Sequence, residues 1–135
     1  MTKMYAGVAI RIKAVFVDVM VMFIMMIIIT YFLSSFEQVS DYTRGFAFVF
    51  IFFLYDPTCT SIFGGTIGHL AVGIRVKREN DENKNIMFPL AILRFIVKSM
   101  LGWISLLTVS GNAKKKAIHD SLIGSVVLLI DKNAI

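Results

Sequence analysis

The sequence predicts an all-α integral membrane protein, a single domain over residues 1–135 with about three transmembrane helices. Hydrophobic residues make up 57% of the chain and charged residues only 17%, and the mean hydropathy is +0.77. A soluble domain of this size buries only about two-thirds of its unfolded surface, too little to hide so many apolar side chains. The apolar residues also form long blocks with basic residues at their flanks, as transmembrane helices do.

The first apolar block runs from Ala14 to about Phe36 and supplies the roughly 20 residues that a spanning helix needs. Asp18 is its only charged residue. An aspartate at the centre of a span costs about 3 kcal/mol, which the apolar residues of this block outweigh. We therefore expect a first transmembrane helix over about 14–36.

The second block begins at Gly45, and its stretch up to Tyr55 covers only about half a bilayer. To span, it must continue through Asp56 and Pro57, which predicts a helix over 45–63 with a kink near the proline. Asp56 either caps a helix segment that Pro57 starts, which we favour, or joins Asp18 in a cation site.

Residues 64–76 are rich in glycine and end in a basic patch. Gly64 and Gly68 have the spacing of a close helix contact, and a flexible turn explains them equally well. Residues 77–87 are polar and of mixed charge, so we expect a solvated loop that could form a small hairpin with residues 73–76.

The third block runs from Phe88 to Val109 and carries Arg94 and Lys98 on one helical face. Two central cations cost about 5–7 kcal/mol, which the apolar residues only just balance. A helix over 88–109 therefore needs an acidic partner, snorkelling side chains or an interfacial first half. The apolar stretch 118–130 is short for a span, so an extra short or re-entrant C-terminal segment is an open alternative.

The distribution of lysine and arginine predicts that the N-terminus is cytoplasmic in a multi-pass protein of the cell membrane. Lys3, Arg11 and Lys13 precede the first predicted helix, whereas the following loop holds only Arg44. A full third span would place residues 114–116, all lysine, outside, which the rule disfavours. The alternative is that 88–109 lies at the interface or re-enters, leaving the C-terminus inside.

Three local patterns, taken in order, resemble the RDD family of small integral membrane proteins. They are R-I-K-A-V-F-V-D at 11–18, G-G-T-I-G-H-L-A-V-G-I-R-V at 64–76 and A-I-H-D-S-L-I-G-S-V-V at 117–127, and Arg94 matches a further recurring arginine. The chain departs from the family at Ile67, His69 and Ser125, where proline, lysine and threonine are common. The arginine and two aspartates for which the family is named resemble Arg11, Asp18 and Asp120. The resemblance implies a membrane fold, with cation/proton antiport in some members and accessory roles in others.

Asp18 and Asp120 are the candidate cation- or proton-binding residues, because carboxylates within membranes commonly mark ion paths. The alternative for Asp18, which we favour, is a charge pair with Arg94 or Lys98. Asp120 forms a proton relay with His119, or it caps the last helix or holds the turn at 114–116; we favour a structural role.

Arg11, Arg94 and Lys98 are the candidates for charge pairs or anchors. We favour a role for Arg11 as a headgroup anchor that also fixes topology. His69 is expected to be a cytoplasmic surface residue.

The remaining observations exclude several function classes. The single cysteine, Cys59, allows no internal disulfide and no zinc motif, and an inert buried thiol is expected. No metal spacing, cofactor motif or nucleophile–base set is visible, so we expect no enzyme and no cofactor. No nucleic-acid motif is visible either, so we expect no nucleic acid as a partner. Two hypotheses remain. One is a transport-related homo-oligomer that moves Na⁺, K⁺ or H⁺. The other is a non-transporting accessory or assembly module, with lipid and a membrane protein as partners, whose buried charges only fix helix packing.

Overall fold

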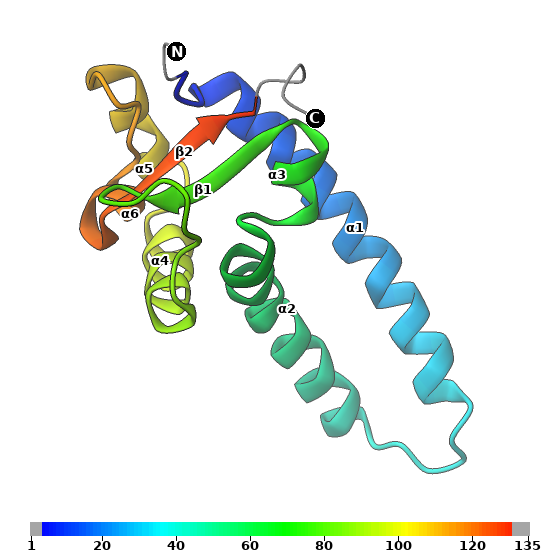
Figure 1. Ribbon diagram of the computed structural model, residues 1–135. Helices are drawn as coiled ribbons and strands as arrows, with labels where there is room; N and C mark the ends of the chain where they lie inside the picture. The colour runs from blue at the N-terminus through cyan, green and yellow to red at the C-terminus, as the bar shows by residue number, and fades with distance from the viewer. Residues whose placement is uncertain (1–3, 131–135) are drawn as a thin grey trace.

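The computed structural model describes residues 4–130, so Lys3 lies outside the described part of the chain. It is mostly helical with one small sheet (Figure 1). The elements in chain order are α1 (Val8–Ser34), α2 (Asp41–Phe63), α3 (Ile67–Ala71), β1 (Ile74–Arg78), α4 (Phe88–Leu101), α5 (Ile104–Leu107), η1 (Thr108–Gly111), α6 (Ile118–Ile123) and β2 (Ser125–Leu129).

The two long helices α1 and α2 form a helical hairpin that extends away from the rest of the molecule (Figure 1). They contain 27 and 23 residues, or roughly 40 and 35 Å of helix, and both are long and apolar enough to cross a membrane. Large apolar side chains such as Phe16, Phe23 and Phe50 are exposed on them. Lipid rather than water must therefore contact these helices, as the composition predicts.

Helix α1 begins at Val8, six residues before the predicted start at Ala14. The extra turns carry Arg11 and Lys13, which precede the predicted membrane helix. They remain helical because Arg11 is buried against the C-terminal part of the chain instead of reaching solvent.

Helix α2 starts at Asp41, where Ser40 accepts a hydrogen bond from the Thr43 backbone N–H at 3.2 Å, and it continues through Pro57. The interpretation of Asp56 as a helix cap is therefore wrong, since Asp56 lies well inside α2. The helix ends at Gly64, whose φ of +77° is a left-handed conformation that glycine adopts without strain.

The third apolar block is broken, because α4 and the α5–η1 segment are bent by 98° around Gly102 and Trp103. Gly102 has a φ of +51°, which ends α4 and lets the chain turn. Within residues 4–130, two helices are thus candidate spans on their own, and the bent pair is a third only if its two parts are counted as one span.

Strand β1 pairs antiparallel with β2, with Val76 opposite Val127. The predicted hairpin between 73–76 and 77–87 is therefore wrong. The 118–130 stretch is not an extra membrane segment either, since it forms α6 and β2. Burial alternates at the start of β1, where Ile74 and Val76 point into the same hydrophobic core.

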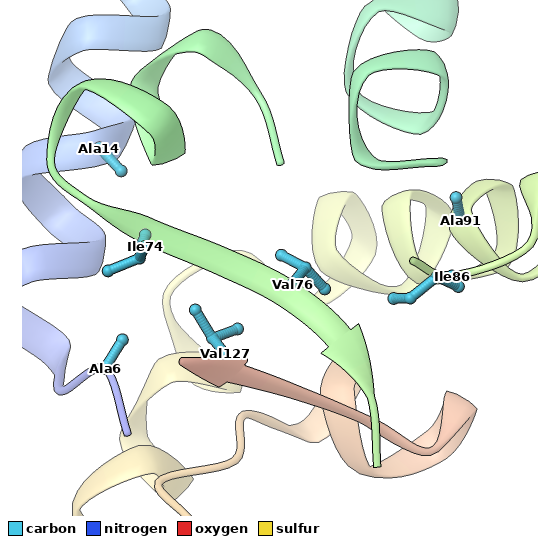
Figure 2. Close-up of a cluster of buried hydrophobic side chains, with 7 residues drawn as sticks. All are labelled: Ala6, Ala14, Ile74, Val76, Ile86, Ala91 and Val127. Carbon is cyan, nitrogen blue, oxygen red and sulfur yellow. The ribbon is translucent and has the colours of Figure 1, made fainter. Parts of the chain in front are cut away.

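A small hydrophobic core joins the sheet to α1 and α4. It consists of Ala6, Ala14, Ile74, Val76, Ile86, Ala91 and Val127 (Figure 2). Tyr5 also bridges Leu128, and the Ala6 backbone N–H donates to the Val127 carbonyl at 2.9 Å. Tyr5, Ala6 and both strands therefore lie at one end of the molecule, and the 35–40 loop lies at the other (Figure 1).

Candidate functional site

Buried charged side chains link four helices at the sheet end of the molecule. Arg11 on α1 donates through Nη1 to Asp120 Oδ2 at 2.6 Å, and Arg94 on α4 donates through Nε to Asp120 Oδ1 at 3.1 Å. All three side chains are at most 5% exposed. Asp120, at the start of α6, is thereby held between two guanidinium groups, and these two neighbours keep its pKa well below its usual range despite its burial.

Asp56 on α2 is connected to the same group of charged side chains. Lys98 Nζ donates to Asp56 Oδ2 at 2.8 Å, and Arg94 Nη1 lies 3.8 Å from Asp56 Oδ1. Thr60, one turn further along α2, donates its hydroxyl to Asp56 Oδ1 at 3.2 Å. The five side chains Arg11, Asp120, Arg94, Asp56 and Lys98 are called the charge network below.

Asp120 also organises the backbone around it. The Ala117 backbone N–H donates to Asp120 Oδ2 at 3.3 Å, so the carboxylate caps α6, and the capping role that we favoured is confirmed. Arg11 Nη2 donates to the Lys115 carbonyl at 2.8 Å, which fixes the basic turn before α6. Arg11 is therefore buried in an ion pair rather than exposed as a headgroup anchor.

Asp18 lies apart from the charge network and is held by uncharged donors. Its Oδ1 accepts from the Tyr55 hydroxyl and the Gly68 backbone N–H, both at 2.8 Å. Its Oδ2 accepts from the Thr66 hydroxyl at 2.6 Å. The favoured pairing of Asp18 with Arg94 or Lys98 is therefore wrong, because the ion-pair partners found for those two cations are Asp56 and Asp120.

Gly68 allows α3 to approach α1 closely. A Cβ at this position would lie 2.1 Å from the Ala14 carbonyl oxygen and 2.6 Å from the Asp18 carboxyl carbon. Only glycine fits this contact without displacing one of the two helices. The sequence left a turn and a close helix contact as alternatives for Gly64 and Gly68. Gly64 forms a turn, and Gly68 forms a close helix contact.

Both histidines are buried and neutral. His69 is 6% exposed, so its predicted position on the surface is wrong. The Thr66 backbone N–H donates a hydrogen bond to His69 Nδ1 at 3.1 Å. His119 Nδ1 lies 2.6 Å from the Ser105 hydroxyl. Burial and the nearby cations Lys98 and Arg94 lower the pKa of His69 to about 3, and burial and Arg94 lower the pKa of His119 to about 3.

Two cavities adjoin these polar groups. One of about 400 Å³ lies between α1, α2 and α4 and is lined by Asp18, Tyr55, Asp56 and Lys98 together with apolar side chains. Another of about 200 Å³ is also lined by Lys98, together with residues that include Arg11, Arg94 and Trp103. Within residues 4–130, no group of three or more histidine, cysteine, aspartate or glutamate side chains is arranged to hold a metal ion.

Asp56 is the residue of this site whose role the sequence interpretation missed. The sequence did contain an indication of this role, because Arg94 and Lys98 share one helical face and an acidic partner was one of the alternatives for them. Asp56 is the only acidic residue in the second apolar block. Because Asp56 followed by Pro57 was interpreted as a helix cap, Asp56 was not considered as the acidic partner of Arg94 and Lys98.

One family model matches the part of the chain that contains the elements of this site. The model of the RDD family matches residues 5–124, from just before α1 through α6. The chain belongs to the RDD family. No curated protein and no solved structure matches it. Of the three residues that resemble the arginine and aspartates of the family's name, Arg11 and Asp120 form one ion pair, whereas Asp18 accepts hydrogen bonds from neutral donors of α2 and of residues around α3. Asp18 and Asp120 therefore have different environments in this chain.

Proposed function

We propose that this protein is a non-transporting membrane assembly module whose buried charges fix the packing of its helices. The observation that supports this best is that the carboxylates of Asp18, Asp56 and Asp120 already accept hydrogen bonds from other residues of the protein. Asp120 accepts from Arg11 and Arg94, Asp56 from Lys98 and Thr60, and Asp18 from three neutral groups. Each carboxylate oxygen already has a donor, which leaves little room for a bound cation. The proposed role involves no catalytic step and no cofactor.

The partner in this proposal is a second copy of the chain or another membrane protein, which packs against the exposed apolar face of α1 and α2. Phe16, Met20, Phe23 and Ile27 follow one another along α1 at helical spacing and are all exposed. Cysteine crosslinking at Met20 in native membranes tests this contact, with Tyr42 at the far end of α2 as the comparison position. A crosslinked dimer or heteromer is expected from Met20→Cys.

We further propose that the protein lies in the cell membrane and that its sheet end faces the cytoplasm. Among the described residues, Arg44 is the only basic residue near the 35–40 loop, whereas Lys13, Arg75 and Lys114 are examples of the many near the sheet. Lysine and arginine collect on the cytoplasmic side of membrane proteins. In this orientation the bent α4–η1 segment enters from the cytoplasmic side and returns to it.

A second candidate function is cation/proton exchange at Asp18. The observation that favours it is the cavity of about 400 Å³, in which Asp18, Asp56 and Lys98 face one space between three helices. Ionisable groups around a cavity at membrane depth are typical of ion paths. Asp18 would then exchange its neutral donors for a cation or a proton.

One experiment separates the two functions. Purified protein in liposomes is tested for Na⁺, K⁺ and H⁺ flux, together with Asp18→Asn and the matched control Asp41→Asn at the far end of α2. The assembly proposal predicts no flux from the unmodified protein and a lower folded yield for Asp18→Asn only. Flux that disappears in Asp18→Asn, with a normal yield of folded protein, establishes exchange instead.

A further inference from the structure

A cavity of about 200 Å³ lies where the beginning of α1 meets the end of α4 and α5. Its polar lining comes from Arg11, His69, Arg94, Lys98 and His119. The cavity is smaller than the roughly 300–1,000 Å³ of sites for drug-sized molecules. Its size therefore suits a compact ligand or one end of a larger ligand.

The polar lining of this cavity is rich in hydrogen-bond donors. Arginine and lysine side chains carry donors and no acceptor. His69 adds another donor, because its Nδ1 accepts the Thr66 N–H and the proton of the neutral ring must then sit on Nε2. The carboxylates Asp56 and Asp120 are not among the lining residues. An anion would accept hydrogen bonds from this lining, whereas a cation would be repelled.

Arg94 supplies an independent indication of a missing acceptor. Its side chain is 1% exposed, and its Nη1 has no hydrogen-bond partner among the described residues, the nearest acid being Asp56 at 3.8 Å. A buried donor without a partner costs free energy, more so when it is charged. The charge network also holds three cations and two carboxylates, so an added anion would balance it.

The rim of the cavity is apolar and continues onto an exposed surface. Trp103 is 64% exposed and lines the cavity with Leu106, while Met100, Ile104 and Leu107 are exposed beside them on the α4–α5 bend. Tryptophan with neighbouring basic residues is typical of the membrane–water interface. Acyl chains could contact this surface while a headgroup enters the cavity.

We propose that this cavity binds a phosphate-type oxyanion, the shared chemistry of an anionic phospholipid headgroup and a free phosphate ester. Arg94, Lys98 and the His69 Nε2–H donate to its oxygens. Trp103 and Leu106 contact the glycerol or acyl portion when the ligand is a lipid.

The test uses the full-length chain in a neutral detergent and the fluorescence of Trp103, the only tryptophan in the chain. The probes are dihexanoyl phosphatidylglycerol, dihexanoyl phosphatidylcholine and glycerol phosphate, with calorimetry as a second readout. Saturable binding is expected for phosphatidylglycerol and not for phosphatidylcholine, which has the same chains but no net charge. Comparable binding of glycerol phosphate identifies a free ester as sufficient, whereas its absence identifies the lipid as the ligand.

Two pairs of variants locate the binding site. Leu106→Glu places a carboxylate at the rim, and Leu107→Glu makes the same change at an adjacent exposed position that does not line the cavity. Lys98→Gln removes a lining cation, and Lys84→Gln removes a lysine from an exposed loop. We expect Lys98→Gln to weaken binding by about tenfold or more, the effect of losing one charged hydrogen bond. Leu106→Glu should also weaken it, because its carboxylate repels an anion, and the two controls should change it little.

The outcomes decide the proposal. Equal binding of phosphatidylglycerol and phosphatidylcholine overturns it, as does undiminished anion binding by both Leu106→Glu and Lys98→Gln. Because Lys98 also pairs with Asp56, Lys98→Gln counts only if its thermal unfolding in detergent remains cooperative. Leu106→Glu touches no ion pair and keeps the test decisive if Lys98→Gln does not fold.

Discussion

Arg11 and Asp120 lie 109 positions apart in the sequence, yet Arg11 Nη1 is 2.6 Å from Asp120 Oδ2 and both side chains are buried. This contact fastens the first membrane helix to the short helix α6 near the end of the chain. Arg94 binds the other oxygen of Asp120 and extends the link to α4. Removing one member of such a buried set leaves the others as uncompensated charges.

Asp120→Asn should therefore strongly destabilise the protein. We expect the free energy of unfolding to fall by about 3–5 kcal/mol, the usual cost of breaking a buried ion pair from one side. Unfolding by increasing mole fractions of a denaturing detergent measures the change. Asp81→Asn is the matched control, since Asp81 pairs with Lys84 in an exposed loop, and it should leave the unfolding midpoint nearly unchanged.

Gly68→Ala should separate α3 from α1. The added Cβ would lie 2.1 Å from the Ala14 carbonyl oxygen, so the helix must move and the hydrogen bond from the Gly68 N–H to Asp18 must lengthen. We expect a loss of about 1–3 kcal/mol, typical of overpacking, in the same detergent unfolding assay. Gly45→Ala in α2 meets no atom within 4 Å and should be neutral or slightly stabilising. Equal stability of the two variants would refute the close contact.

Mild acid should destabilise the protein through its two histidines. The pKa of both His69 and His119 is lowered from 6.5 to about 3, so between these values the unfolded chain binds protons that the folded chain does not. Stability therefore falls as the pH falls below about 6.5. Asp120 and Glu79, whose pKa values are also lowered, contribute only below their unfolded values of 3.8 and 4.5.

Unfolding midpoints measured from pH 7 to pH 5 isolate the histidine contribution. His119→Asn, in which the amide can replace the contact with Ser105, should show a shallower dependence on pH than the unmodified protein. Identical slopes for the two proteins would mean that His119 is not buried in its neutral form.

Both ends of the bent α4–η1 segment should lie on the same side of the membrane. In a Cys59→Ala background, cysteines at Asn83 and Ala113 should react with a membrane-impermeant maleimide from one side, and a cysteine at Gln38 from the other. The reason is that the chain before α4 and the chain after η1 both return to the sheet. Opposite labelling of Asn83→Cys and Ala113→Cys would establish a complete third span.

Sequence patterns predicted the membrane fold because insertion depends on local hydrophobicity, which is readable along the chain. They placed Phe63 at the end of α2, as observed. For Arg94 and Lys98 they left an acidic partner, snorkelling and an interfacial position as alternatives. The partner itself is a matter of tertiary packing, since Asp56 meets Lys98 across 42 positions.

The β1–β2 pairing was not predicted for a similar reason. The segment 125–129 is short and apolar, and such a segment is compatible with part of a membrane helix as well as with a buried strand. Only the contact of Val127 with Val76 and the bridge from Tyr5 to Leu128 decide between them. His69 was misplaced because burial of a polar residue depends on partners such as Thr66, which no periodicity reveals.

A double-mutant cycle on Arg11 and Asp120 tests most directly whether buried charges hold the helices together. Unfolding free energies are measured for the unmodified protein, Arg11→Gln, Asp120→Asn and the double variant in one detergent system. The account predicts a coupling of about 1–3 kcal/mol, as for residues in one ion-pair network. Additivity within about 0.3–0.5 kcal/mol, the behaviour of distant and independent sites, would contradict it.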